Sequence, residues 1–270
     1  MQEDVFPVAA VQMVSGLSLD DNLRQAAHWV GEAARAGARL VALPEYFCFM
    51  GRRDPDKLAL AETPGAGPIQ SFLADLARRH GLWLVGGTLP LHSPDAQRIY
   101  NACLVFDPQG RQAARYDKIH LFGFKKDAES YDESISIRPG DNPPQVFSMP
   151  FGRVALAVCY DLRFPELFRA QGDVRLMVVP AAFTYTTGSV HWQVLLRARA
   201  IENQCYVLAS AQGGVHENGR RTWGHSMLID PWGDVLASLP EGPGLVSGAL
   251  EAARLAAVRQ ALPALRHRVL

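Results

Sequence analysis

The chain lacks long apolar runs, a surplus of either charge, and a cysteine-rich motif. No apolar stretch approaches the roughly 20 residues of a transmembrane helix, so the sequence predicts no membrane span. The 27 basic and 27 acidic side chains balance, which argues against binding of nucleic acid or anionic lipid driven by bulk charge. The acidic start (residues 1–4) does not look like a signal peptide, so we expect a cytoplasmic protein.

Cysteine is scarce, and known cofactor motifs are absent. The four cysteines (Cys48, Cys103, Cys159 and Cys205) are far apart and form no CxxC pair, which gives no support to a zinc cluster or a redox motif. In a reducing compartment we expect free thiols. HExxH and P-loop motifs are also missing, so zinc protease and nucleotide hydrolase chemistry have no motif here. We expect neither a metal nor an organic cofactor.

What is present is an ordinary globular composition, with 48% hydrophobic and 20% charged residues among 270. This predicts one domain over residues 1–270. The first third alternates strand and helix patterns: strands at 6–13, 39–43 and 82–89, a helix capped by Asp20 or Asp21 that runs to about 36, and a helix at 69–80. Such alternation is typical of βαβ units, so the fold class is α/β.

The rest of the chain adds two hairpins and a long loop. Residues 99–116 and 227–238 each read as a β-hairpin with a Pro- and Gly-containing turn, which indicates two similar sheets packed face to face. The polar segment 122–144 is predicted to be a long loop, and 190–204 has helical periodicity.

Cys159 occupies the most suggestive position. It ends the apolar run 154–158 and precedes a turn and a helix that begins at Pro165. A strand that stops at a thiol projects the sulfur from the edge of the sheet, and the backbone N–H groups that follow are placed to hold an oxyanion. Cys159 is therefore a candidate nucleophile for attack on an acyl carbon.

Glu45 and Lys118 follow two other predicted strands. A carboxylate is a suitable general base for a thiol, and an ammonium group favours the thiolate and stabilises a tetrahedral intermediate. Taken singly, such a glutamate more often caps a helix or faces solvent, and such a lysine more often forms an exposed ion pair. Together with Cys159 they supply complementary chemistry at three strand ends, and this predicts one shared site.

Three segments make the chain resemble the nitrilase superfamily of carbon–nitrogen hydrolases: 43–45 (LPE), 116–122 (YDKIHLF) and 158–166 (VCYDLRFPE). The resemblance implies a four-layer α-β-β-α sandwich, with Glu45 as general base and acid, Lys118 as stabiliser of the tetrahedral intermediate, and Cys159 as nucleophile. It also implies a positioning role for Glu133. Members of this superfamily usually dimerise, so the resemblance implies a homodimer or a higher homo-oligomer.

Other segments resemble the branch of deaminated glutathione amidases and ω-amidases, among them 180–184 (PAAFT), 195–202 (LLRARAIE) and 224–233 (GHSMLIDPWG). The resemblance implies hydrolysis of a small, carboxylate-bearing amide through a cysteine thioester, with release of ammonia. In this mechanism Lys118 and the backbone N–H of Tyr160 hold the oxyanion. Gly123 and the short C-terminal tail depart from the family pattern.

Substrate recognition is predicted from residues near the nucleophile. Arg163 is the first candidate for binding a carboxylate, since guanidinium groups suit carboxylates; the alternative is a structural ion pair with Glu166 or Asp161. The other candidates for the pocket wall are Phe183, Thr184 and His191.

Several rival readings stay open. A Cys–His hydrolase could use His120, His191 or His225 as base, although a lone histidine is more often structural. Gly224-His-Ser-Met-Leu lacks the second glycine of a serine nucleophile elbow. Within the superfamily the alternatives are ω-amidase acting on α-ketoglutaramate, N-carbamoyl-amino-acid amidohydrolase and nitrilase. A catalytically idle binding scaffold is the non-enzyme alternative.

Overall fold

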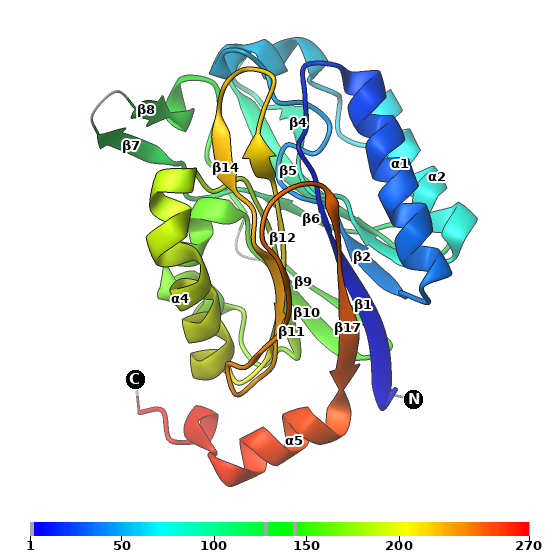
Figure 1. Cartoon of the computed structure of the whole chain (residues 1–270), viewed down its shortest axis with the longest axis vertical. Coiled ribbons are helices and arrows are strands. Elements are labelled where there is room, and N and C mark those ends of the chain that lie inside the picture. Colours follow the sequence, from blue (N-terminus) through cyan, green and yellow to red (C-terminus); the bar gives the residue numbers. More distant parts are fainter. Residues whose placement is uncertain (1–2, 127–128, 143–144, 270) are drawn as a thin grey trace.

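Two β-sheets lie face to face, and helices cover their outer faces (Figure 1). The computed structural model describes residues 3–126, 129–142 and 145–269. The layers run helix, sheet, sheet, helix, which confirms the predicted four-layer sandwich.

The first sheet has seven strands in the order β17-β1-β2-β3-β5-β4, with β6 paired to β5. The neighbours β1, β2 and β3 run parallel, as the alternation of strands and helices predicted, because parallel neighbours need a crossover connection. The strands of this sheet are β1 (Val5–Gln12), β2 (Leu40–Ala42), β3 (Trp83–Val85), β4 (Leu89–His92), β5 (Ile99–Phe106), β6 (Gln112–Asp117) and β17 (Gly244–Glu251).

The second sheet has six strands in the order β16-β15-β12-β11-β10-β9. Its centre is parallel, from β10 through β11 to β12. Both predicted hairpins are present, one per sheet, as β5–β6 and β15–β16. The strands are β9 (Val146–Met149), β10 (Gly152–Leu156), β11 (Leu176–Ala181), β12 (Tyr206–Ala211), β15 (Ser226–Ile229) and β16 (Val235–Leu239).

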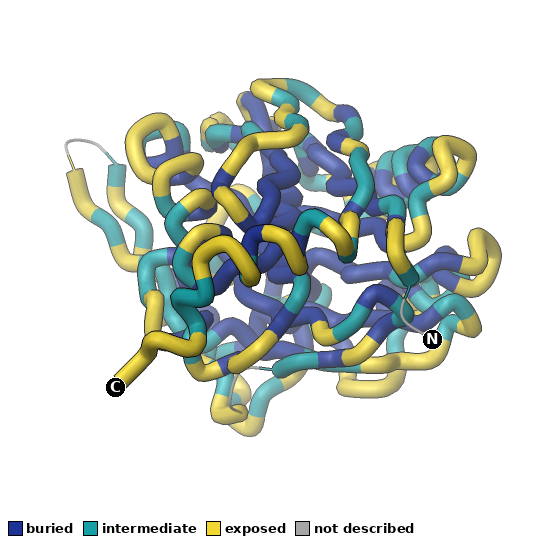
Figure 2. The backbone as a smooth tube through the Cα atoms, turned by 90° about the horizontal axis from the view of Figure 1, so that it is seen from below, coloured by how far each residue is buried: buried dark blue, intermediate teal, exposed yellow. Residues whose placement is uncertain are grey.

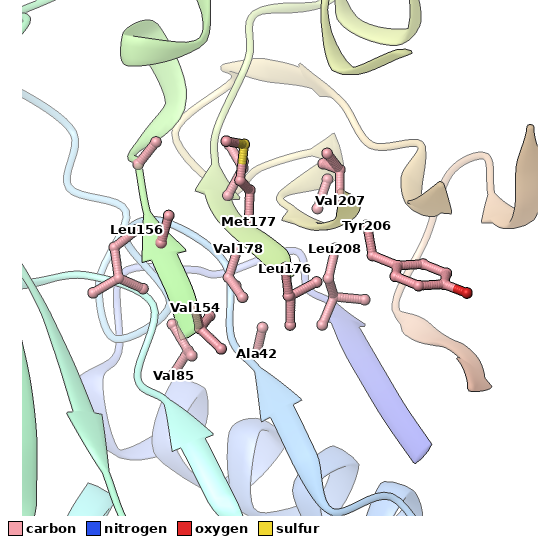
Figure 3. Close-up of a cluster of buried hydrophobic side chains, with 14 of the residues drawn as sticks. Ala42, Val85, Val154, Leu156, Leu176, Met177, Val178, Tyr206, Val207 and Leu208 are labelled. Carbon is pink, nitrogen blue, oxygen red and sulfur yellow. The ribbon is translucent and has the colours of Figure 1, made fainter. Parts of the chain in front are cut away.

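The main core fills the space between the sheets. Ala42 and Val85 of the first sheet meet Val154 and Leu176 of the second, and all four side chains are fully shielded from solvent (Figure 3). Viewed from below, the buried backbone forms a continuous centre with exposed segments around it (Figure 2). Strands in the middle of such a sandwich are apolar on both faces, since helices cover the side that the other sheet does not.

Helices α1 (Leu19–Arg35) and α2 (Pro68–His80) cover the first sheet, and α3 (Pro165–Ala170) and α4 (Tyr185–Asn203) cover the second. The predicted cap of α1 was wrong: Ser18, not Asp20 or Asp21, accepts the N–H of Asp21. The two aspartates instead lie in the first turn, where negative charge is favourable. Helix α4 begins five residues earlier than predicted, because Thr184 caps it.

The predicted strand 82–89 is divided into β3 and β4. Gly87 has a φ of +57°, and a Cβ atom there would lie 2.2 Å from the carbonyl oxygen of Pro44, so the chain turns at this glycine. The predicted loop 122–144 also holds regular structure, namely β7 (Gly123–Lys126), β8 (Glu129–Asp132) and the 3-10 turn η2 (Glu133–Ile135); residues 127–128 and 143–144 of that prediction lie outside the described residues. Strands β7 and β8 pair antiparallel, so this part of the segment is a hairpin and not the irregular loop that the sequence predicted.

A second small hairpin, β13 (Gly213–Val215) with β14 (Arg221–Trp223), projects from the same end of the sandwich as β7 and β8 (Figure 1). The opposite end carries α5 (Ala252–Ala261). The remaining 3-10 segments are η1 (Asp54–Leu60), η3 (Cys159–Arg163) and η4 (Ala264–Arg266). In the described ranges, no helix combines the length and apolarity that a bilayer crossing requires.

Candidate active site

The three predicted residues, Glu45, Lys118 and Cys159, each lie just after the end of a strand, and the three strand ends lie close together. Glu45 lies just beyond β2, Lys118 directly follows β6, and Cys159 opens η3 after β10. Glu45 and Cys159 line the same pocket, and Lys118 lies behind it, fully buried. The pocket encloses about 270 Å³ of empty space including its mouth, and its other lining residues are Phe122, Glu133, Tyr160, Arg163, Ala182, Phe183, Thr184, Thr187 and Arg220.

The Lys118 ammonium is clamped between two carboxylates. Its Nζ lies 2.8 Å from Oε1 of Glu45 and 2.8 Å from Oε2 of Glu133. Burial by itself would lower the pKa of Lys118, but the two carboxylates and the nearby Cys159 outweigh burial and raise that pKa above its ordinary value. The lysine is therefore charged at any physiological pH, as a stabiliser of an oxyanion must be.

Glu45 is oriented by two further donors. The side-chain amide of Asn101 donates to Oε1 at 2.9 Å, and the backbone N–H of Ala182 donates to Oε2 at 2.9 Å. Both carboxylate oxygens therefore have partners, and the side chain is 1% exposed. A general base must be held within reach of its proton, and this arrangement fixes the carboxylate at the pocket wall.

Glu133 stands on the far side of the lysine. Tyr46 donates its hydroxyl to Oε1 at 2.7 Å, and the backbone N–H of Phe122 donates to Oε2 at 2.7 Å. Burial by itself would raise the pKa of Glu133, but the charges of Lys118 and Lys57 and the hydrogen bonds from Lys118 and Phe122 lower it below its ordinary value. Both oxygens of Glu133 thus lie within hydrogen-bonding distance of the Lys118 ammonium group.

Cys159 sits on a sharp turn. It has a φ of +50°, is the first residue of η3, and is only 7% exposed. Burial, and next the charge of Glu45, raise the pKa of the Cys159 thiol well above its ordinary value, while Lys118 and a backbone hydrogen bond from Ala182 oppose that rise. The resting thiol is therefore protonated, and a protonated thiol needs a base before it can act as a nucleophile.

Asp161 ties the nucleophile turn to the lysine segment. Its Oδ2 accepts the N–H of Val158 at 2.8 Å and the hydroxyl of Tyr116 at 2.7 Å. Its Oδ1 lies 2.7 Å from Nδ1 of His120 and accepts the backbone N–H of that residue at 3.2 Å. One buried carboxylate thus links the segment before Cys159 with the residues on either side of Lys118.

The predicted oxyanion donor and two of the predicted wall residues lie in the pocket. Tyr160 is the second residue of η3, where a helix has N–H groups without an intrahelical acceptor. Phe183 and Thr184 follow β11 and are 5% and 2% exposed. Thr184 also caps α4, so it has a structural task besides lining the pocket.

Arg163 and His191 differ in their placement. Arg163 lines the pocket, with its guanidinium over the rings of Tyr160 and Phe183, and it forms no ion pair with Glu166 or Asp161. His191 does not line the pocket; it lies on the exposed face of α4, with Nδ1 3.1 Å from Nη1 of Arg163. The prediction that His191 forms part of the pocket wall is thus not supported by its position, because its place on α4 turns it outward.

The three histidines of the Cys–His alternative have other partners. His120 contacts Asp161 and stacks on Phe164, and His225 stacks on Trp223. No hydrogen bond joins any of them, or His191, to Cys159, whereas the carboxylate of Glu45 lines the same pocket as the sulfur. Within the part of the chain that the structure describes, no three His, Cys, Asp or Glu side chains gather into a possible metal site.

Sequence reasoning missed several residues around the site. Asn101 is a fully buried polar residue within the apolar strand β5, and that contrast is the signal that could have identified it. Tyr46 adjoins Glu45 but showed no distinct pattern. Arg220 lies in a polar turn of the sequence, yet it lines the pocket. Its position depends on how the β13–β14 hairpin folds back, which no local pattern indicates.

The comparisons with known proteins agree with this geometry. The family model for carbon–nitrogen hydrolases matches residues 7–260. A deaminated glutathione amidase of Synechocystis is 44% identical over 98% of both chains, and the human deaminated glutathione amidase is 42% identical over 97% of this chain and 81% of its own length. The human ω-amidase NIT2 is 35% identical over 97% of this chain and 95% of its own length.

Solved structures show the same fold. The NitFhit protein of C. elegans superimposes with a TM-score of 0.89 at 36% identity, covering all of this chain and 66% of that one. A mutant of an amidase from Nesterenkonia sp. AN1, with the acetamide moiety of fluoroacetamide added covalently to its active-site cysteine, gives a TM-score of 0.82 at 28% identity, covering 98% of this chain and 94% of that one. The chain belongs to the carbon–nitrogen hydrolase family, the nitrilase superfamily, and is a hydrolase of carbon–nitrogen bonds other than peptide bonds.

Proposed function

We propose that this protein, as a single catalytic domain over residues 1–270, hydrolyses a small, carboxylate-bearing amide of the deaminated glutathione type through a thioester on Cys159. The observation that carries the proposal is the Glu45–Lys118–Glu133 array beside a buried thiol in one pocket. The amidase relatives at 42–44% identity support the same reaction class.

The first step is attack by sulfur on the amide carbonyl. Because the thiol is protonated at rest, Glu45 takes its proton as the sulfur–carbon bond forms. The carbonyl electrons move onto oxygen, and Lys118 with the N–H of Tyr160 stabilises the resulting oxyanion. Glu133 holds the ammonium group in place during this change.

In the second step the amide nitrogen leaves, and in the third step water releases the carboxylic acid from the thioester. Glu45 returns its proton to the nitrogen as the carbon–nitrogen bond breaks, leaving a thioester. The nitrogen departs as ammonia from a primary amide and as an amine from a substituted one. Glu45 then accepts a proton from the water that attacks the thioester, and the carboxylic acid leaves as Cys159 regains its proton.

A substrate panel tests the proposal. Deaminated glutathione, α-ketoglutaramate, an N-carbamoyl amino acid and a simple nitrile would each be incubated with the enzyme, and the acid product measured by mass spectrometry. We expect the highest kcat/KM for deaminated glutathione. A higher value for α-ketoglutaramate would favour the ω-amidase alternative, which the 35% identical NIT2 supports, and turnover of only the last two would overturn the proposal.

Matched variants separate chemistry from folding. Cys159→Ala should abolish turnover, and Glu45→Gln should lower kcat by roughly 10²- to 10⁴-fold, the usual contribution of general acid–base catalysis. Cys205→Ala is the control, because this cysteine is buried in the core away from the pocket. A catalytically idle scaffold would show no thioester adduct on Cys159 in the wild-type protein under rapid quench, and none of these substitutions would matter.

We further propose a cytoplasmic homodimer. The four cysteines are buried free thiols, which suits a reducing compartment. Helix α4 exposes Val190 and Val194, at 67% and 66%, and the turn that carries Trp232 packs beside Arg197 of the same helix. Apolar side chains gathered on an outer helix are typical of a surface that another subunit covers.

A further inference from the structure

Arg220 is a half-buried cation in the turn of the β13–β14 hairpin, directly before β14. It lines the same pocket as Cys159 and Glu45. The hairpin places this side chain over the pocket, whereas the neighbouring Arg221 points to the outside, where it pairs with Glu241 at 2.8 Å and lies over the ring of Tyr185. Two consecutive arginines thus have opposite surroundings.

The guanidinium of Arg220 is poorly satisfied. Its Nε is buried and has no hydrogen-bond partner, and its Nη2 makes one long contact of 3.5 Å, to the carbonyl of Ala182. The ring of Tyr131 lies 4.9 Å from the guanidinium carbon. Across the described ranges, no carboxylate forms an ion pair with this side chain. A cation whose donor is buried without a partner is costly unless an anion completes it.

Ala182 connects Arg220 with the reacting groups. The carbonyl of Ala182 faces Arg220, while its N–H donates to Oε2 of Glu45 at 2.9 Å and also interacts with the Cys159 sulfur. The Arg220 guanidinium, the Glu45 carboxylate and the Cys159 sulfur therefore all interact with the backbone of Ala182. A small acyl group attached to Cys159 could reach the unused donors of Arg220.

The other pocket cation has less free donor capacity. Arg163 lies between the rings of Tyr160 and Phe183 and contacts His191. Glu45 and Glu133 are neutralised only in part, because Lys118 supplies a single positive charge to both. An incoming carboxylate would meet repulsion from these groups unless a cation with unused hydrogen-bond donors faced the pocket.

We propose that Arg220 binds the carboxylate of the substrate and so selects anionic amides. This inference rests on the proposed amidase function and names the residue that sets its substrate class. The guanidinium fork offers two parallel N–H donors, which match the two oxygens of a carboxylate. The bound carboxylate would satisfy the buried Nε and balance the charge of the pocket wall.

The kinetic test compares two amides of the same length, glutaramate with its carboxylate and glutaramide without charge. In Arg220→Gln we expect KM for glutaramate to rise roughly 10- to 100-fold, as for loss of a charge-assisted hydrogen bond, while KM for glutaramide changes less than about threefold. Arg220→Lys should recover part of the loss. Arg221→Gln is the matched control and should affect neither amide. Equal changes for both amides, or none, would overturn the proposal.

A binding test does not depend on turnover. Glutarate would be titrated calorimetrically into Cys159→Ala protein, with and without Arg220→Gln. We expect at least about tenfold weaker binding when Arg220 is replaced. Unchanged binding refutes the role of Arg220 even if the enzyme is an amidase. Conversely, weakened binding together with no turnover of any amide by the wild type would leave the anion site standing and refute the amidase function.

Discussion

At the scale of single residues, the site is a set of coupled charges rather than independent groups. Lys118 satisfies Glu45 and Glu133 at once, and each of these carboxylates has its own hydrogen-bond donors. Buried ion pairs are strongly destabilising when one partner is removed, because a charge is left without compensation. A substitution of Glu45, Lys118 or Glu133 should therefore alter the pKa of the neighbouring groups as well as the rate of the reaction.

Glu45→Gln should separate thiol ionisation from catalysis. The Glu45 charge raises the pKa of Cys159, so its removal should lower that pKa and move the pH midpoint of iodoacetamide alkylation downward, although amide turnover is lost. Lys118→Met should move the midpoint upward, because the lysine lowers that pKa. Alkylation measured against pH, with the adduct located by peptide mass spectrometry, checks both directions. A slower reaction in Glu45→Gln at every pH would contradict this account.

Glu133 should make the protein acid-sensitive. Its pKa is lowered from an ordinary 4.5 in the folded state, so the folded carboxyl binds a proton more weakly than the unfolded one. Its contribution to the free energy of unfolding is therefore complete above the unfolded pKa and is lost as the pH falls through the lower, folded pKa. Urea denaturation between about pH 5 and pH 3 should show a steeper loss for wild type than for Glu133→Gln. Parallel curves would exclude Glu133 as the source.

At the scale of elements, the turn that carries Cys159 depends on contacts from outside the turn. A non-glycine residue at a φ of +50° is unfavourable by itself, and surrounding interactions must compensate for it. The Asp161 carboxylate supplies them by accepting hydrogen bonds from the backbone of Val158 and from Tyr116. The nucleophile turn and the segment that carries Lys118 are thereby joined.

Asp161→Asn should weaken the contacts between the turn that carries Cys159 and the segment that carries Lys118. An amide group cannot accept from all the donors that now surround the carboxylate, so we expect the free energy of unfolding to fall by about 3 kcal/mol and kcat to fall with it. Tyr116→Phe removes one donor and should cost only about 1 kcal/mol. Glu166→Gln, a change at a nearby exposed residue, is the control. Urea denaturation of the three variants decides; equal stability of Asp161→Asn and wild type would refute the role.

At the scale of the whole molecule, the sandwich brings distant segments together at one end. Glu45 and Lys118 come from the first sheet, and Cys159 from the second, so the pocket exists only where the two sheets meet. The β7–β8 and β13–β14 hairpins project at this end (Figure 1). Arg220, in the turn of the latter hairpin, lines the pocket. Val190 and Val194 remain exposed on the outer surface of α4.

The homodimer proposal predicts a concentration-dependent change of state. Introducing charge with Val194→Glu on α4 should shift the sedimentation coefficient from dimer toward monomer, since charges are depleted at interface centres. Val5→Glu, at a position 56% exposed on β1, is the matched control and should leave the association unchanged. A wild-type monomer at all concentrations, or identical behaviour of the two variants, would contradict this assembly.

The sequence alone determined the local features and the chemistry of the site. Apolar periodicity gave the βαβ units and both sheet-forming hairpins, because burial imposes a period on each element. The strand-end positions of Glu45, Lys118 and Cys159 indicated a nucleophile with a base and a cation. Short-range errors arose where a glycine turn split one strand and where Ser18 rather than an aspartate capped α1.

Tertiary structure decided which side chains meet. Asn101 and Ala182 contact Glu45 from positions 56 and 137 residues away along the chain, and no local pattern encodes such distances. The same holds for Arg220, which faces the pocket because its hairpin folds back, while His191 faces outward because of its place on α4. Residue type and spacing specify what a site can do chemically; long-range packing specifies which groups share it, since those contacts form only when both sheets close on a common core.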